Sequence, residues 1–340
     1  MLKRQAGRLL AAVVLGAALV SLPTGQAGAA GTTGIAACTW QKTLWELPEG
    51  TEAGEINGYD GGRYAVGNTG LDFAWGDGLV DPRATLWDNG RVVMRGAGQV
   101  PYFNDVNASG LVVGAMYLNQ RFYAITVAHD GTMTDLPANP AWTSSWASWV
   151  NNRGDIIGWG TIGSAKSRMV VWPANAPGTY REVTMPDAHG VSLVDVDEQG
   201  RVIIGVSPGG SYVLTPAGQW TTLAAPGVKG AGIPRDIRDG RVVGRLDIAP
   251  NYGGAVAEWD AQGAVVRTIG RPAVEGISLG GNGTIAGYGF VGSSQRVMLW
   301  RDGVMVAQPI AARFELTGLS DDERTIVGVE ADRPAHYRCS

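Results

Sequence analysis

The sequence has few charged residues and no excess of basic ones. Charged residues make up 17% of the chain, with 27 lysines and arginines against 31 aspartates and glutamates. This balance argues against nucleic acid or an anionic membrane surface as a partner, because either would select a basic stripe. With only two cysteines and three histidines, the chain lacks the clustered ligands of a zinc site. No stretch keeps a 3.6-residue apolar period, which excludes a largely helical fold.

The longest apolar run lies near the N-terminus. Three basic residues precede the run from Leu9 to Leu22, and Ala27-Gly28-Ala29 follows as a small-residue cleavage site. We therefore predict a signal peptide over residues 1–29 and a secreted, extracellular mature protein with no membrane segment. The run is shorter than the ~20 residues of a typical membrane span, and an uncleaved anchor is the alternative. Loss of the three basic residues would move the net charge from −4 to −7.

The two cysteines lie near opposite ends of the predicted mature chain. In an exported protein, Cys38 and Cys339 are expected to form a disulfide with each other. The alternative is acylation of Cys38, because Ile35-Ala36-Ala37-Cys38 resembles a lipobox. A lipobox normally follows the apolar run directly, and acylation would leave Cys339 unpaired.

Short β-branched runs separated by Gly, Asn and Asp predict an all-β chain. An apolar run that ends in glycine recurs seven times, at spacings of 47, 44, 47, 39, 43 and 41 residues. Seven units of this length predict a seven-bladed β-propeller with four strands per blade, formed by residues 30–340 as a single domain. The glycines that end these runs are Gly67, Gly114, Gly158, Gly205, Gly244, Gly287 and Gly328.

The second unit shows the predicted parts of a blade. Its four strands, a to d, are expected at about 103–106, 111–113, 122–127 and 132–136, with turns rich in Asn, Asp and Gly because tight hairpins need positive φ. Tryptophans at matching points of strand c are predicted to pack between blades: Trp87, Trp172, Trp259 and Trp300.

The seventh unit lacks its last strand. Residues 43–48 parallel residues 132–137, which include strand d of the second unit. We therefore predict that an N-terminal strand completes the last blade and closes the ring, which removes its open edges. The predicted Cys38–Cys339 disulfide would join the two ends at the same place.

The stretches 105–114 and 130–136 resemble the bacterial extracellular repeats called the HAF family, and weaker copies cover nearly all of the mature chain. The tripeptide that names the family is replaced here by Tyr123-Ala124-Ile125 in unit 2 and Ala84-Thr85-Leu86 in unit 1. The resemblance implies an extracellular β-repeat protein. It implies no activity and no catalytic residues.

Two short motifs match enzyme signatures without the structure that those signatures need. Residues 205–209 fit a nucleophile elbow, but Pro208 cannot supply the backbone N–H of an oxyanion hole. Residues 158–163 fit a dinucleotide fingerprint, but the segment that follows reads as another strand, so no helix N-terminus holds a pyrophosphate.

The residue two places before the first turn of each unit is often acidic. If strand a lines the central channel, these acids form a ring that could bind a cation or supply paired acid and base groups. We favour the alternative that each carboxylate accepts hydrogen bonds from local backbone amides, as repetition of one residue type predicts. The seven residues are Glu55, Asp105, Trp149, Asp195, Asp236, Ser278 and Gly318.

The b–c and d–a connections vary in length and should project from one face of the propeller, where binding usually occurs. Tryptophan and tyrosine beside Asp and Asn are typical of sugar or peptide recognition. The longest b–c connection is expected at 68–82. Trp146 and Trp149 are assigned to packing between blades instead, and loop tryptophans can also fold back onto their own blade. The predicted ligand-binding residues are Asp72, Trp75, Asp77, Tyr117, Trp142, Trp159, Asn251 and Tyr252.

These observations favour a non-enzymatic extracellular binding or scaffold protein whose partner is a glycan, cell-wall material or another protein. The alternatives are a polysaccharide hydrolase or lyase that uses channel acids such as Asp105 and Asp195, and a matrix protein without a small ligand. No cofactor is predicted. Calcium at Asp72, Asp77 and Asp81 is an alternative, although their spacing lacks the EF-hand order.

Overall fold

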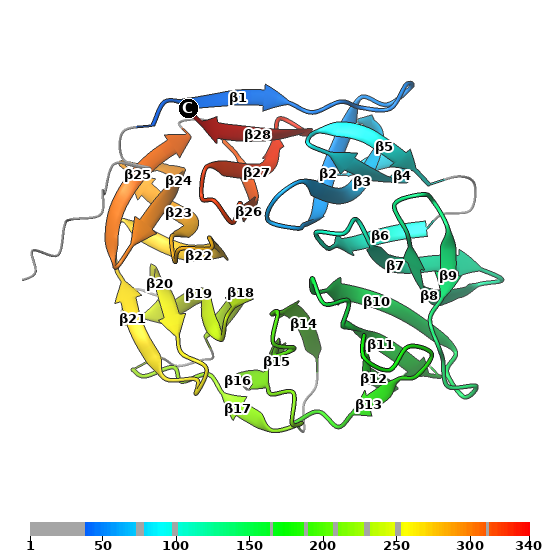
Figure 1. Cartoon of the computed structure of the whole chain (residues 1–340). Helices are drawn as coiled ribbons and strands as arrows, with labels where there is room; N and C mark the ends of the chain where they lie inside the picture. Colours follow the sequence, from blue (N-terminus) through cyan, green and yellow to red (C-terminus); the bar gives the residue numbers. More distant parts are fainter. Residues whose placement is uncertain are drawn as a thin grey trace, which may run out of the picture.

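The computed structural model is all-β and describes residues 38–72, 78–96, 101–163, 166–186, 190–206, 210–227, 232–248, 253–310 and 313–340. Its strands form seven four-stranded antiparallel sheets, arranged radially in a ring as Figure 1 shows. The predicted seven-bladed β-propeller is confirmed. Within the described ranges, no helix is long and apolar enough to cross a membrane.

Each blade runs from an inner strand at the channel to an outer strand at the rim (Figure 1). Blades 1 and 2 contain β2 (Ala53–Tyr59), β3 (Tyr64–Asp72), β4 (Leu79–Asp88), β5 (Arg91–Arg95), β6 (Pro101–Val106), β7 (Val112–Leu118), β8 (Arg121–Val127) and β9 (Met133–Asp135). Blades 3 and 4 contain β10 (Ser144–Val150), β11 (Ile156–Ile162), β12 (Lys166–Trp172), β13 (Arg181–Val183), β14 (Val191–Val196), β15 (Val202–Val206), β16 (Gly210–Leu214) and β17 (Trp220–Thr222). Blades 5 and 6 contain β18 (Ile233–Arg238), β19 (Arg241–Ile248), β20 (Gly253–Trp259), β21 (Val265–Ile269), β22 (Ala273–Leu279), β23 (Ile285–Val291), β24 (Ser294–Arg301) and β25 (Val304–Ile310). Blade 7 contains β26 (Glu315–Leu319), β27 (Thr325–Glu330), β28 (Arg333–Cys339) and β1 (Trp40–Leu44).

The middle hairpins are longer than the sequence pattern predicts. In blade 2, β7 continues to Leu118, which pairs with Arg121 across a two-residue turn. The turn residues Asn119 and Gln120 have φ of 49° and 63°, the left-handed backbone that tight hairpins require. In blade 1, most of the predicted connection 68–82 is strand, because β3 and β4 pair as far as Asp72 and Leu79. Only 73–78 separates these strands.

The core lies between neighbouring blades. Central strands are covered on both faces, so Val112 and Val113 of β7 are both fully buried, which explains why strand b is apolar throughout. The strand c tryptophans Trp87, Trp172, Trp259 and Trp300 are at most 3% exposed, as predicted. Three of these indole N–H groups donate to a carbonyl of the connection that enters the blade: Trp87 to Glu46 (2.8 Å), Trp172 to Pro137 (2.7 Å) and Trp259 to Ala224 (2.7 Å).

The ring closes as the sequence predicts, with a shift in the strand boundaries. β1 pairs antiparallel with β28 and completes blade 7. The strand ends at Leu44 rather than near Pro48, because the next residues turn toward blade 1, where the Glu46 amide donates to the carbonyl of Gly90 (2.9 Å). Trp45, which lies between Leu44 and Glu46 in the sequence, is 5% exposed and packs against Trp87 with ring centroids 5.7 Å apart.

Cys38 and Cys339 form a disulfide with a Cα–Cα separation of 5.2 Å. The predicted pairing is confirmed, and the lipobox alternative does not apply because the Cys38 sulfur is bonded to Cys339. The disulfide lies beside the β1–β28 pair, where Trp40 is opposite Cys339. The covalent link and the hydrogen-bonded link therefore close the ring at one place.

Candidate functional site

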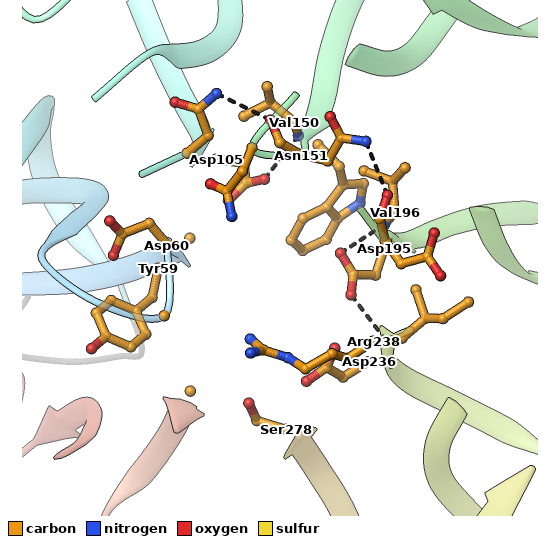
Figure 2. Close-up of a pocket in the computed structure, with 18 of the residues that line it drawn as sticks. Tyr59, Asp60, Asp105, Val150, Asn151, Asp195, Val196, Asp236, Arg238 and Ser278 are labelled. Atoms are coloured by element: carbon orange, nitrogen blue, oxygen red, sulfur yellow. Dashed lines mark hydrogen bonds between the residues drawn. The ribbon is translucent and has the colours of Figure 1, made fainter. Parts of the chain in front are cut away.

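The inner strands surround a central channel that contains a cavity of about 260 Å³. Residues of the inner strands and of the turns after them line it, and acidic residues outnumber arginines among them. Figure 2 shows Asp105, Asp195, Asp236 and Arg238 around this space. The channel is the first candidate site, because aspartate and arginine side chains from several blades line it.

A β-bulge in each inner strand determines which residue occupies the position predicted for the ring of channel acids. The residue after the bulge is Asp105 in blade 2, Asp195 in blade 4 and Asp236 in blade 5. The prediction for blade 1 is wrong, because Gly58 holds this position and Glu55 does not. Asn57-Gly58 resembles a turn in the sequence but lies inside β2, and Glu55 instead accepts a hydrogen bond from the Asn68 side chain (2.7 Å).

The ring side chains accept hydrogen bonds from the inner strand of the next blade. A carboxylate or hydroxyl on one blade thereby satisfies a backbone amide on its neighbour, which ties the blades together around the channel. This arrangement gives the acids a structural function, as we favoured from the sequence, but the amides belong mainly to the next blade and not to the local turn as predicted. The four bonds run from Val150 to Asp105 (2.9 Å), Ile237 to Asp195 (3.0 Å), Leu279 to Asp236 (2.6 Å) and Leu319 to Ser278 (3.1 Å).

Burial changes the charge of this ring. It raises the pKa of Asp105 to about 7. Burial and the adjacent carboxylate of Asp236 raise the pKa of Asp195 well above its ordinary value. The Arg238 guanidinium pairs with Asp321 of blade 7 at 2.5 Å. Across the part of the chain that the structure describes, no group of three or more His, Cys, Asp or Glu residues is arranged to hold a metal ion.

Replacing Asp105 with asparagine is expected to raise stability above pH 7. The folded pKa of about 7 exceeds the ordinary value of 3.8, so folding takes up a proton between these values. The free energy of unfolding therefore falls as pH rises through this window. Asparagine can accept the same bond from the Val150 amide without placing a charge in the channel.

The measurement is the melting temperature from pH 4 to 9. We expect a shallower decline for Asp105→Asn than for the wild type, and a melting temperature several degrees higher at pH 8. Asp135→Asn, an exposed acid of β9, is the control and should follow the wild type. Identical profiles for Asp105→Asn and the wild type would show that the buried carboxyl group does not titrate in this window.

The predicted ligand-binding residues are spread over several blades. Four of them lie outside the described residues: Trp75, Asp77, Asn251 and Tyr252. Asp72 is exposed at the end of β3, and Tyr117 is 41% exposed near the end of β7. Among the described residues, no hydrogen bond, ion pair or ring contact joins Asp72 to Tyr117.

Trp142 and Trp159 are buried in blade 3, with 7% and 8% of their surface exposed. The Trp142 indole covers Gly160, where a Cβ atom would lie 2.4 Å from the ring, and it packs against Tyr180 at 5.0 Å. Trp159 belongs to the core between blades 3 and 4. Trp142 therefore folds back onto its own blade, which is the alternative that the sequence left open for loop tryptophans, and Trp159 fills space between blades.

Four aromatic rings meet at the b–c end of blade 2 and form what we call the aromatic cluster: Tyr102, Tyr117, Phe122 and Trp146. Phe122 is the central ring, with centroids 5.8 Å from Tyr102, 4.9 Å from Tyr117 and 6.4 Å from Trp146. Tyr102 and Tyr117 are 39% and 41% exposed. The sequence predicted Tyr117 alone, although its pairing with Phe122 across the β7–β8 hairpin follows from the extended hairpin.

No family model and no curated protein matches this chain. Its fold is similar to that of virginiamycin B lyase from Staphylococcus aureus, with a TM-score of 0.56, 14% identity, and coverage of 88% of this chain and 99% of that chain. A catalytically inactive variant of that enzyme with quinupristin gives a TM-score of 0.57 at 14% identity and the same coverage. The β-propeller domain of the Trilobed protease from Pyrococcus furiosus gives 0.53 at 11% identity, covering 84% of this chain and 95% of that chain. These identities show the propeller fold alone, and the HAF resemblance stays a prediction.

Proposed function

We propose that this chain is a secreted binding protein whose aromatic cluster contacts an extracellular glycan, a cell-wall component or a protein. The supporting observation is that two tyrosines of the cluster are about two-fifths exposed while their rings are held by Phe122. Exposed rings offer apolar faces to a sugar or peptide, and their hydroxyls add directional hydrogen bonds.

Contact among the rings makes this surface suitable for binding. Phe122 is half-buried, and its amide donates to the Ser144 hydroxyl of blade 3 (3.2 Å), so the centre of the cluster is attached to two blades. Ligand binding therefore orders few additional side chains, which reduces the entropic cost of association. The propeller supplies a rigid scaffold beneath the cluster, as binding and scaffold proteins of this fold require.

Removing one exposed ring is expected to weaken ligand binding. A glycan array and sedimentation with purified cell-wall material identify the ligand, and Tyr117→Ala and Tyr102→Ala are then compared with the wild type. We expect each to bind about tenfold less tightly, which corresponds to about 1.4 kcal/mol. Tyr117→Phe keeps the ring and should retain most of the affinity.

Val304→Ala is the control, because Val304 is 65% exposed on blade 6 and lies away from the cluster. Wild-type affinity in both tyrosine-to-alanine variants would contradict the assignment of the cluster. A wild type that binds none of these materials would contradict the proposed function itself.

The second candidate function is a polysaccharide hydrolase or lyase in the channel. It is favoured by the carboxylate of Asp195, whose pKa is raised by burial and by the neighbouring carboxylate of Asp236, because an acid with a raised pKa beside a second carboxylate is typical of acid–base catalysis. Purified protein should then degrade polysaccharides, and Asp195→Asn should abolish the activity while Tyr117→Ala preserves it. Absence of turnover across a panel of polysaccharides would leave the binding function as the proposal.

A further inference from the structure

A second cleft lies where the ring closes, between blades 7 and 1. We call it the seam cleft. It has a volume of about 330 Å³ and includes Trp45, Tyr59, Arg63, His336 and Arg338 among its lining residues. His336 and Arg338 belong to β28 and are two residues apart, so their side chains share the face that is directed toward blade 1. The a–b turns of both blades complete the walls.

The acidic side chains around the seam cleft already have partners. Asp321 pairs with Arg238, and Asp322 accepts hydrogen bonds from the Ser320 hydroxyl and the Arg324 amide. On the blade 1 side, the Arg63 guanidinium forms a two-point ion pair with Asp88.

Unlike these charged side chains, Arg338 has no such partner in the part of the chain that the structure describes. Its side chain is exposed and its guanidinium makes no hydrogen bond or ion pair with the described residues, although its charge acts on Tyr59, Asp322 and His336. A guanidinium that faces a cleft without a partner favours a ligand with an oxyanion, which it can bind with two parallel hydrogen bonds.

His336 presents a donor to the same cleft. The indole N–H of Trp45 donates to its Nδ1 (2.8 Å), so the proton of the neutral ring must be on Nε2. Burial and, to a smaller extent, the charge of Arg338 lower the pKa of His336, which keeps the ring neutral at pH 7. Nε2–H is therefore a second hydrogen-bond donor close to the guanidinium.

We propose that the seam cleft binds a small ligand carrying a carboxylate or phosphate group, held by the Arg338 guanidinium and the His336 Nε2–H. Tyr59 and the edge of Trp45 supply flat walls for an apolar or aromatic body next to the anionic group. The cleft lies at the face of the a–b and c–d turns, whereas the aromatic cluster lies at the opposite, b–c end. The two sites are therefore independent of each other.

The test uses ligands that share a ring and differ in charge: benzoate, phenyl phosphate and the neutral benzamide. Calorimetric titration of the full mature protein should detect benzoate or phenyl phosphate but not benzamide, and the stronger of the two anions identifies the group. Arg338→Gln should bind at least tenfold less tightly. Arg91→Gln removes the same charge from an exposed position on β5 and should bind as the wild type does.

A second readout reports on the site directly. The pKa of His336, followed by NMR and assigned with His336→Asn, should rise when the anion binds, because a nearby negative charge favours the imidazolium. The proposal is overturned if the wild type binds neither anion, if benzamide binds equally well, or if Arg338→Gln and Arg91→Gln lose the same affinity. It is also overturned if saturation with the anion leaves the pKa of His336 unchanged.

Discussion

Replacing Cys38 and Cys339 together with serine is expected to lower the free energy of unfolding by as much as about 5–6 kcal/mol. The disulfide joins residues separated by 301 positions in the sequence. In the chain-entropy description, a cross-link that closes so long a loop removes many conformations from the unfolded state. The loss should therefore appear as a lower denaturation midpoint.

The pairing of β1 with β28 cannot replace the disulfide. β1 is five residues long, and its last four residues are exposed, so its pairing with β28 buries little apolar surface. Trp45, which follows β1, is the main apolar anchor of the N-terminal segment. Without the disulfide, we expect β1 to detach before the rest of the ring unfolds.

Urea unfolding of three samples tests this expectation: the oxidised wild type, the reduced wild type and the double serine variant. The last two should coincide, and reductant should have no effect on the variant. Amide hydrogen exchange should show lost protection in β1 and β28 of the variant and native protection in β7. A variant as stable as the oxidised wild type would show that noncovalent contacts alone close the ring.

The fold could be predicted because each blade repeats the same local requirements. An apolar run followed by glycine recurs in the second strand of every unit, and counting these glycines gives the number of blades. The glycine is needed because a side chain at Gly114 would lie 1.7 Å from the carbonyl oxygen of Tyr102. The seam was also predictable, since the missing last strand and the cysteines point to the same place.

The sites were harder to predict because they depend on register and on contacts between blades. One misplaced turn in blade 1 assigned Glu55 to the ring in place of Gly58. Composition identified tryptophans as ligand contacts, but burial decides their role, and Trp142 and Trp159 are in the core. The sequence alone does not identify Phe122 and Tyr102 as members of the aromatic cluster, because their contact depends on how the long β7–β8 hairpin lies beside the neighbouring strand.

Glu323 is a further contact between blades that no single repeat reveals. In blade 2, the Asn107 side chain accepts hydrogen bonds from the Ser109 and Leu111 amides of its own turn, both at 3.1 Å. Blade 6 has Gly280 at the equivalent position. There, Glu323 of blade 7 reaches across and accepts the corresponding amides of Asn282 (2.9 Å) and Thr284 (2.8 Å).

The backbone conformation of Glu323 is unusual for a residue other than glycine. Its φ is +61°, a left-handed conformation that glycine adopts at the same turn position in blade 2, where Gly110 has a φ of 78°. The Glu323 side chain is 1% exposed and pairs with Arg301. A Cβ atom at Gly280 would lie 2.4 Å from Glu323 Cγ, so the glycine in one blade and the glutamate in the next depend on each other.

Glu323→Gly is therefore expected to destabilise the protein by about 2–4 kcal/mol, because two backbone amides lose a charged acceptor. Relief of the left-handed backbone offsets this loss by about 1 kcal/mol or less. Gly280→Asn alone should also be destabilising, because its Cβ collides with the Glu323 side chain. The double variant recreates the turn of blade 2, with the cap within its own blade, and should recover most of the stability of the wild type.

The four proteins form a double-mutant cycle that urea unfolding can measure. A favourable coupling between the two substitutions would show that the cap can be supplied either from within the turn or from the next blade. Additive losses would mean that asparagine at position 280 cannot supply the cap, and they would contradict the mutual dependence of positions 280 and 323. Arg324→Gln, an exposed neighbour of Glu323, is the control and should leave the free energy of unfolding nearly unchanged.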